Sequence, residues 1–366
     1  MSARAGGREF PIEPPIKPML ARASPSLPED GAWLFEPKWD GFRAIVFRGA
    51  AELHIQSRDL KPLDRYFPEL HDALLERLPA GCVVDGEIVI ATDRGLDFDA
   101  LQMRIHPAAS RVAKLAEAMP ASFVAFDVLA AGGDDLMSAP QRERRAALER
   151  LLEHAGAPVH LTPVTRELRE AAIWLDRFEG AGLDGVIAKP EDAAYAPGKR
   201  AMLKIKHVRT ADVVVAGFRW HKSSRDAVGS LLLGLYDDRG VLQHVGVTSS
   251  FTMAKRRSLV AELEPLRHGA RDGHPWEARA EAEPGDRAPG GQNRWSAGKD
   301  LSWEPLRVER VAEVKYDHLQ GTRFRHAPTF LRWRPDKRPE ECGYDQLDTP
   351  RPYELDKVFS VGSGDS

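Results

Sequence analysis

Short segments with strand character recur along this chain, and they restrict its fold more than any other feature. Phe42–Phe47 and Glu52–Gln56 flank a turn at Arg48–Ala51, and Glu52–Gln56 alternates polar with apolar side chains. Cys82–Ile90 and Phe123–Leu129 predict two further strands that are buried. We therefore expect sheets built from short strands.

Helical periodicity appears between the strands of the first half. Gln141–His154 places its leucines on one face and is followed by a glycine that suits a C-terminal cap. Glu167–Phe178 predicts a second helix. Strand character then returns in two lysine-containing segments, Gly185–Lys189 and Met202–Lys206. The mixture predicts the fold class α+β.

The strand pattern starts again near Thr210. A chain of 366 residues is expected to hold two domains. The second set of segments comprises strands at Ala211–Phe218, Ser230–Tyr236, Val241–Val245, Val308–Tyr316 and Phe330–Trp333, with a helix at Thr252–Leu266. Short strands, one helix and a basic surface are typical of a small β-barrel of the OB type. The Gly- and Pro-rich stretch 268–298 predicts a long mobile loop.

These changes of pattern divide the chain into four parts. Residues 1–30 are rich in Pro and Gly and predict an extended arm over the first domain. The first domain is expected at 31–209 and the OB-type domain at 210–345, followed by a tail at 346–366. We find no internal repeats.

Cysteine use and hydropathy indicate a reduced, aqueous compartment. Cys82 and Cys342 lie far apart without metal-ligand spacing, so we expect two free thiols rather than a disulfide. Residues 1–17 are polar and Pro-rich, without the apolar core of a signal peptide, and no apolar run is long enough to span a bilayer. The sequence therefore predicts a cytoplasmic protein that does not bind membranes.

The net charge of −3 does not identify a partner, because the distribution of charge matters more than its sum. Basic residues gather in two places, Lys199–Arg209 and Arg323–Arg338. Taken alone, each cluster is more typical of a solvated charged face than of a nucleic-acid site. A nucleic-acid partner would nevertheless require clusters of this kind.

Lys38 stands at the end of an apolar strand and precedes Asp40–Gly41, a turn that lets the backbone approach a ligand closely. A lysine acts as a nucleophile only after losing its proton, which burial and neighbouring positive charge both promote. A surface lysine leading into a hairpin is the alternative. Lys-x-Asp-Gly alone is too short to exclude it.

The longer pattern Lys-x-Asp-Gly-x-Arg resembles the signature of covalent nucleotidyltransferases, which include DNA ligases, RNA ligases and mRNA capping enzymes. The other motifs of these enzymes follow in order at Ser57–Asp59, Asp85–Glu87, Phe126–Leu129, Asp184–Lys189, Leu203–Lys206 and Arg334–Lys337. The series resembles most closely the ATP-dependent DNA ligases, in particular the short two-domain actinobacterial form called ligase C. This resemblance implies a nucleotidyltransferase domain of ATP-grasp-like antiparallel sheets with flanking helices, followed by an OB-fold barrel.

The resemblance also implies a role for each matched residue. Lys38 would attack the α-phosphate of ATP and carry the AMP. The groups implied around the nucleoside are Glu36 on the adenine edge, Phe126 on its face, and Arg43 and Arg58 on the ribose and phosphate. The groups implied around the phosphates are Lys189, Lys204 and Lys206 at the α-phosphate, with Arg334 and Lys337 on the leaving pyrophosphate. Positioning and cations of this kind supply most of the catalysis of phosphoryl transfer.

The resemblance implies that Glu87 bonds either the ribose or a Mg²⁺ shell. Glu87 and Asp184 are the candidates for holding Mg²⁺, which prefers oxygen ligands and keeps most of its waters. Mn²⁺ is an alternative ion. Many family members carry Glu where this chain has Asp184, and the shorter side chain leaves room for a bridging water. Structural alternatives exist, in which Phe126 is simple core and Glu87 is a solvated strand residue. Asp127 is a further candidate, as a metal ligand or equally as a structural hydrogen-bond acceptor.

The resemblance implies an enzyme that seals 5′-phosphate/3′-hydroxyl nicks in duplex DNA during repair. It also implies a monomer, with a repair polymerase as a candidate partner. Sealing needs no base readout, so the two basic clusters would hold DNA through its phosphates. An RNA ligase or a capping guanylyltransferase would share the first step and differ in the acceptor. A non-catalytic OB-fold protein that binds nucleic acid is a third hypothesis, and the intact Lys38, Arg43, Glu87 and Lys206 argue against it.

Overall fold

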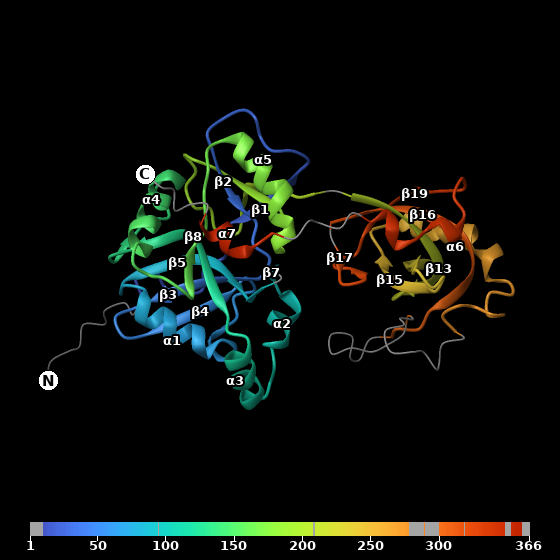
Figure 1. Ribbon diagram of the computed structural model, residues 1–366, viewed down its shortest axis with the longest axis horizontal. Helices are drawn as coiled ribbons and strands as arrows, with labels where there is room; N and C mark the ends of the chain where they lie inside the picture. The colour runs from blue at the N-terminus through green and yellow to red at the C-terminus, as the bar shows by residue number, and fades with distance from the viewer. Residues whose placement is uncertain are drawn as a thin grey trace. The chain divides into compact units, whose positions relative to one another are not determined.

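The computed structural model describes residues 10–93, 95–207, 209–277, 289, 300–317, 319–347 and 353–360. The chain divides into two compact units, one formed by residues 1–207 with 350–366 and the other by residues 208–349. Figure 1 shows that each unit is built around its own sheets. Most of the loop predicted at 268–298, namely 278–288 and 290–299, lies outside the described residues.

A four-stranded sheet in the first unit carries the lysine motifs. Its strands lie in the order β1 (Leu20–Ser24), β12 (Arg200–Ile205), β11 (Val186–Pro190) and β2 (Trp33–Pro37). β1 runs parallel to β12, whereas β11 is antiparallel to both β12 and β2. Part of the predicted arm at 1–30 is therefore a strand of this sheet, and motifs far apart in the chain become neighbours.

The second sheet of this unit contains the segments that the sequence predicted as buried strands. Its strands lie in the order β10 (Val159–Leu161), β8 (Ser122–Ala131), β5 (Cys82–Val89), β3 (Phe42–Arg48) and β4 (Leu53–Ser57), with β9 (Asp134–Asp135) paired to β8. Their β-branched and aromatic residues suit a pleated, buried surface. Val46, Val84 and Phe123 accordingly have no exposed surface. A separate hairpin joins β6 (Ala91–Thr92) and β7 (Gly95–Leu96).

Helices bury their apolar faces against these sheets. α4 (Gln141–Leu152) and α5 (Leu168–Arg177) confirm the two predicted helices, and each helix end lies within two residues of its predicted position. α1 (Pro68–Arg77), α2 (Phe98–Met103) and α3 (Ala109–Ala118) were not predicted from the sequence. The short 3₁₀ helices of the chain are η1 (Asp64–Tyr66), η2 (Phe178–Ala181), η3 (Pro339–Glu341) and η4 (Tyr344–Gln346).

The second unit is a five-stranded antiparallel sheet with one helix, which confirms the predicted OB-fold. Its strands lie in the order β15 (Leu242–Thr248), β14 (Ser224–Tyr236), β13 (Arg209–His221), β16 (Glu304–Tyr316) and β19 (Thr329–Trp333). A short hairpin joins β17 (Leu319–Gln320) and β18 (Arg323–Phe324). α6 (Met253–Arg267) begins at Thr252, whose hydroxyl accepts a hydrogen bond from the Lys255 amide, and it buries Leu259 and Leu263 in the core.

The last described element, α7 (Leu355–Ser360), belongs to the first unit (Figure 1). Leu355 and Val358 are buried in the core that contains Trp39. The Phe359 ring stacks on Trp39 at a centroid distance of 5.1 Å and on His160 at 4.2 Å. The predicted tail at 346–366 therefore includes a helix that packs against the residue following Lys38.

Two further features concern the cysteines and the hydropathy of the helices. Cys82 and Cys342 are free, buried thiols, as predicted, and burial raises the pKa of each to about 12. Such thiols are unreactive at neutral pH. In the described part of the chain, no helix is both long enough and apolar enough to cross a bilayer.

Replacing Phe359 tests whether α7 stabilises the first unit. We expect Phe359→Ala to lower the free energy of unfolding by about 2 kcal/mol, because the ring is lost from a partly buried aromatic stack. Urea unfolding followed by circular dichroism measures the change. Lys357→Ala on the exposed side of the same helix is the control, since its surface ion pair with Glu354 contributes little. Equal midpoints for the two variants would show that the helix does not stabilise this unit.

Candidate active site

Backbone hydrogen bonds fix the position of Lys38 against a segment 146 residues later in the chain. The Lys38 amide donates to the Gly185 carbonyl, and the Asp184 amide donates to the Lys38 carbonyl, each over 2.8 Å. Two glycines permit this close packing. A Cβ atom on Gly41 would lie 2.1 Å from the Ile88 carbonyl oxygen, and one on Gly185 would lie 2.1 Å from that of Ile205. Side chains at either position would push the motifs apart.

The Asp184 carboxylate lies between two lysines. Its Oδ2 is 2.5 Å from Lys38 Nζ, and its Oδ1 is 2.8 Å from Lys206 Nζ. Burial alone would raise the pKa of Asp184, but Lys38 and Lys206 lower it below the usual value. Partial burial lowers the pKa of the neighbouring Lys204, and repulsion from Lys206 and Lys38 lowers it further. The site is therefore a cationic cluster held together by one acid.

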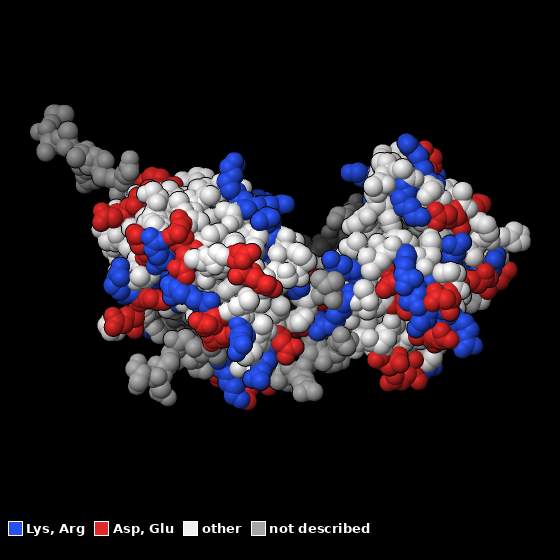
Figure 2. Space-filling view, turned by 90° about the horizontal axis from the view of Figure 1, so that it is seen from above, with Lys and Arg blue, Asp and Glu red and all other residues white. Residues whose placement is uncertain are grey.

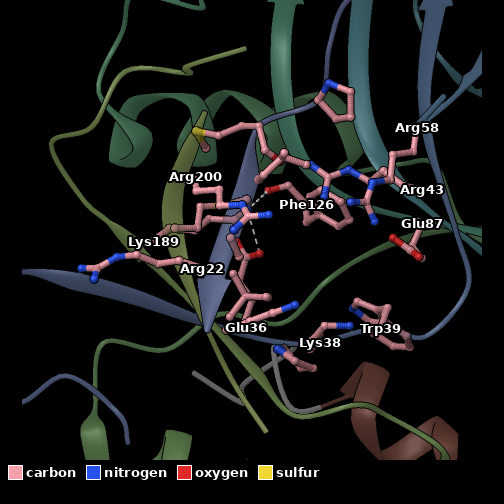
Figure 3. A pocket seen from close by; sticks show the side chains of 18 of the residues that line it. Arg22, Glu36, Lys38, Trp39, Arg43, Arg58, Glu87, Phe126, Lys189 and Arg200 are labelled. Atoms are coloured by element: carbon pink, nitrogen blue, oxygen red, sulfur yellow. Dashed lines mark hydrogen bonds and ion pairs between the residues drawn. The ribbon is translucent and has the colours of Figure 1, made fainter. Parts of the chain in front are cut away.

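These groups adjoin a cavity of about 360 Å³, a size typical of small-molecule sites. Figure 3 shows the labelled side chains arranged around it. The predicted residues that line the cavity are Glu36, Lys38, Arg43, Arg58, Glu87, Phe126, Lys189 and Lys204. Lys206 and Asp184 join the group through Lys38. Ten predicted residues of the first unit thus converge on one site.

One side of the cavity is built from Glu36, Lys189 and Phe126. Lys189 Nζ lies 2.8 Å from Glu36 Oε2 and donates to the Phe126 carbonyl over 2.6 Å (Figure 3). Burial raises the pKa of Glu36, opposed by Lys189 and Arg145. Glu36 Oε1 is buried without a hydrogen-bond partner among the described residues. Lys189 was expected at the α-phosphate, with the cluster around Lys38. Its ammonium instead forms an ion pair with Glu36.

Arg43 belongs to a buried network behind the cavity. Its Nε and Nη2 donate to the two oxygens of Asp85 over 2.6 and 2.7 Å, and its guanidinium lies 4.4 Å from the centre of the Phe126 ring. The Tyr195 hydroxyl donates to Asp85 over 2.6 Å and accepts a hydrogen bond from the Met19 amide over 2.9 Å. Through Met19, the residue directly before β1, Tyr195 links this strand to the Arg43–Asp85 pair. Arg43 is thus engaged within the protein, with Phe126 fixed on its face.

Glu87 presents the carboxylate best suited to a metal ion. It lines the cavity, its Oε1 accepts a 3.2 Å hydrogen bond from the Gly41 amide, and desolvation raises its pKa to about 7, opposed by Arg43 and Lys38. Among the described residues, no three His, Cys, Asp or Glu side chains form a metal-binding group. One or two carboxylates suffice for Mg²⁺ when phosphates and waters complete its shell. The donor set therefore fits an ion held by Glu87 together with a bound phosphate.

The two other carboxylates considered for metal binding are occupied by cations. Asp127 accepts hydrogen bonds from Arg144 over 2.8 and 3.1 Å and from the Val128 amide, so it acts as a structural acceptor. Asp184 would have to exchange a lysine for the metal. These contacts favour the structural alternative for Asp127.

Several cavity residues were missed at the sequence level. Arg22 on β1 and Arg200 on β12 both line the cavity. Alternation along β12 places Arg200, Met202 and Lys204 on one face, so the period of two could have identified Arg200. Arg22 and Tyr195 carry no comparable signal, because only the tertiary fold brings them to the site.

The remaining two predicted residues, Arg334 and Lys337, lie in the second unit and share a partner there. Arg334 Nη1 lies 2.9 and 3.0 Å from the two oxygens of Asp212, and Lys337 Nζ lies 3.4 Å from Asp212 Oδ2. Other members of the Arg323–Arg338 cluster pair with acids as well, Arg332 with Glu313 and Arg338 with Glu341. On the face shown in Figure 2, blue and red residues are accordingly interspersed on both units.

Comparisons with known proteins agree with the geometry of the site. The family described as ATP dependent DNA ligase domain matches residues 18–206, and that described as ATP dependent DNA ligase C terminal region matches residues 224–337. The chain is similar to DNA ligase C2 of Mycolicibacterium smegmatis, with 56% identity over 345 residues, which are 93% of this chain and 97% of that protein. It is also similar to DNA ligase C of Mycobacterium tuberculosis, with 53% identity over 356 residues, or 96% and 98% of the two chains.

A solved structure supports the fold independently. A Lig E DNA ligase superposes with a TM-score of 0.54 over 86% of this chain and 99% of that chain, at 17% sequence identity. At this identity the likeness concerns the fold alone. It agrees with the α+β first unit and the OB-fold of the second.

Removing the Tyr195 hydroxyl tests the network behind the cavity. We expect Tyr195→Phe to lower the free energy of unfolding by about 1–2 kcal/mol, because a buried Asp85 oxygen loses a donor and the Met19 amide loses an acceptor. Urea titration measures the change. Tyr66→Phe is the matched control, since the hydroxyl of this half-buried tyrosine makes no hydrogen bond to the described residues. Identical midpoints for wild type and Tyr195→Phe would contradict the role assigned to this hydroxyl.

Proposed function

This chain belongs to the ATP-dependent DNA ligase family, and we propose that Lys38 carries the AMP with which it seals nicks in duplex DNA. The family and the use of ATP agree with the ordered motifs of the sequence. The assignment to Lys38 rests on one observation, the ion pair of its amine with Asp184 beside the cavity, with Lys206 on the same carboxylate. This places the amine among cations that would attract a phosphate.

The Glu36 side of the cavity is the proposed site of adenine. Glu36 Oε1 is buried and has no hydrogen-bond partner among the described residues, with Arg145 Nη1 at 3.9 Å, so it would accept a hydrogen bond from the exocyclic amine of adenine. Guanine carries a carbonyl oxygen at that position, which would face the carboxylate unfavourably. Lys189 would hold Glu36 in place, and Phe126, which lines the cavity, would stack on the base with the part of its ring that Arg43 and Lys189 leave uncovered. The pocket thus favours ATP over GTP, which argues against a capping guanylyltransferase.

The Lys38 side is the proposed site of the phosphates. Lys38 would first pass its ammonium proton to Asp184, and the neutral amine would then attack the α-phosphorus of ATP. A second proton would be lost to water while the bond to the pyrophosphate oxygen breaks. Lys204, Lys206 and Arg58 would neutralise the charge that develops on the phosphoryl oxygens. Arg334 and Lys337 would orient the leaving pyrophosphate. Positioning and fixed charge are sufficient for this step, because in-line transfer needs little covalent participation by the protein.

Two further transfers would complete the reaction. A 5′-phosphate oxygen of the nick would attack the phosphorus of the Lys38 adenylate, and the phosphorus–nitrogen bond would break. The 3′-hydroxyl would then attack the activated 5′-phosphate, lose its proton and expel AMP. DNA would be held through its phosphates, since no base needs to be read. A role in repair, with a repair polymerase as partner, fits this chemistry and stays a proposal.

Mg²⁺ would be held by the Glu87 carboxylate and by phosphate oxygens of ATP. When bound, it neutralises negative charge on the phosphates. Glu87 itself has two duties in this arrangement. It accepts the Gly41 amide, which fixes the turn after Lys38, and it offers a carboxylate to the ion.

Replacing the nucleophile tests the proposal directly. We expect Lys38→Ala to lose sealing of 5′-phosphorylated nicks by at least about a thousandfold, because no other group can form the adenylate. The same variant should still seal a nick that already carries the 5′-adenylate, since that step bypasses Lys38. Gel assays with labelled nicked DNA measure both steps.

The control for this experiment is Lys114→Ala, an exposed lysine on α3 away from the cavity. Wild-type enzyme should use ATP but not GTP, and nicked DNA in preference to nicked RNA. Sealing by Lys38→Ala at the wild-type rate would refute the assignment. A preference for RNA would favour the RNA ligase alternative, and the absence of any adenylate would favour a non-catalytic protein.

The proposed role of Lys337, in the second unit, can be tested in the same assays. We expect Lys337→Ala to slow adenylation by about tenfold or more while sealing of pre-adenylated nicks changes little, because Lys337 would act on the pyrophosphate only. Lys315→Ala, an exposed lysine on β16, serves as the matched control. An equal loss in both steps would mean that Lys337 does not serve the first step specifically.

A further inference from the structure

Asp212 is a buried acid at the start of β13 that binds two cations of the motif Arg334–Lys337. Its residue surface is only 9% exposed. Both of its oxygens lie within 3.0 Å of Arg334 Nη1, and Oδ2 lies 3.4 Å from Lys337 Nζ. An acid in this position would be costly to bury alone, so the two cations and the acid form one unit. No motif used to recognise the family includes this residue.

The fold holds Asp212 rigidly at the centre of its sheet. Asp212 lies opposite Glu313 of β16, and Glu313 lies opposite Arg332 of β19. Gln346 clamps its backbone from the other side, accepting from the Asp212 amide over 2.7 Å and donating to its carbonyl over 2.9 Å. The carboxylate therefore projects from backbone that is fixed on both edges.

The two cations are mounted on a turn directly after β19. The Arg334 amide donates to the Val311 carbonyl over 2.8 Å, and the Lys337 amide donates to the Arg334 carbonyl over 3.2 Å. Both side chains are long and flexible, and each would rotate freely if it had no partner. The Nε and Nη2 atoms of Arg334 bond to Asp336, which is exposed and lies on the same turn. Asp212 is thus the partner that fixes the pair relative to the body of the unit.

We propose that Asp212 is a positioning residue for adenylation, which holds Arg334 and Lys337 at a fixed spacing so that they bind the pyrophosphate group together. This inference rests on the proposed function, in which those two cations act on the leaving pyrophosphate. Preorganisation removes the entropic cost of ordering two side chains at the moment of binding. Because Asp212 touches no reacting atom, its contribution would be confined to steps that involve pyrophosphate.

The test compares two substitutions that remove the same charge from neighbouring positions. Asp212→Asn keeps the shape of the side chain and weakens its hold on both cations. Glu313→Gln, directly opposite in the sheet, releases Arg332 and leaves the hydrogen bonds between Arg334 and Asp212 in place, although it also removes a weaker electrostatic attraction on Arg334. For each full-length variant we would measure the single-turnover rate of adenylation with ATP and the reverse reaction, in which pyrophosphate removes AMP from the adenylated enzyme. The reverse reaction reports the KM for pyrophosphate directly.

We expect Asp212→Asn to slow adenylation and to raise the KM for pyrophosphate, each by about tenfold, with sealing of pre-adenylated nicks within about twofold of wild type. Glu313→Gln should leave adenylation and the pyrophosphate KM unchanged. Asp212→Glu, which keeps the charge on a longer arm, should recover part of the loss. It also provides a folded variant if Asp212→Asn proves unstable.

The inference is overturned if Asp212→Asn adenylates at the wild-type rate or faster with an unchanged pyrophosphate KM. It is also overturned if sealing of pre-adenylated nicks falls in parallel, because the acid would then only support the fold. Failure of wild-type enzyme to form any adenylate would instead refute the proposed function. The two failures are therefore distinguishable.

Discussion

The active site depends on the contact between Lys38 and Asp184. This ion pair, with the two reciprocal backbone hydrogen bonds around it, joins β2 to the turn before β11 across 146 residues of sequence. It places Lys38, the proposed nucleophile, near the end of β12, where Lys204 and the following Lys206 complete the cationic cluster. The ladder of β2, β11 and β12 sets the spacing of the strands, and the ion pair fixes the Lys38 amine relative to Lys206 at their ends.

Ion pairs recur around the cavity, and their main effect is to hold functional side chains in position. Glu36 is fixed by Lys189, and Arg43 by Asp85 with the help of Tyr195. Such pairs contribute little net stability, because desolvation offsets most of their attraction. They do hold each functional group in one orientation, which phosphoryl transfer requires. In the second unit, the carboxylate of Asp212 between Arg334 and Lys337 repeats the same principle.

The sequence was sufficient for the family, the order of the motifs along the chain and eight of the residues that line the cavity. Glu87 and Phe126 lie on predicted strands, and Lys38 directly follows another strand. The partner of Lys189 was not predictable, because a lysine gives no local indication of which buried acid it will meet. Likewise α7 packs on Trp39 through tertiary contacts only. Helices α1 to α3 were not predicted, although α1 and α3 have 10 residues each, like α5, because much of their stability comes from packing against the rest of the unit rather than from propensity.

The most direct test of this account is the location of the covalent nucleotide. Purified enzyme would be incubated with ATP and Mg²⁺, digested, and examined by mass spectrometry of its peptides. The account predicts a single added AMP on the peptide that contains Lys38, removable by pyrophosphate. An AMP carried on any other residue, or no AMP on an enzyme that still seals nicks, would contradict it.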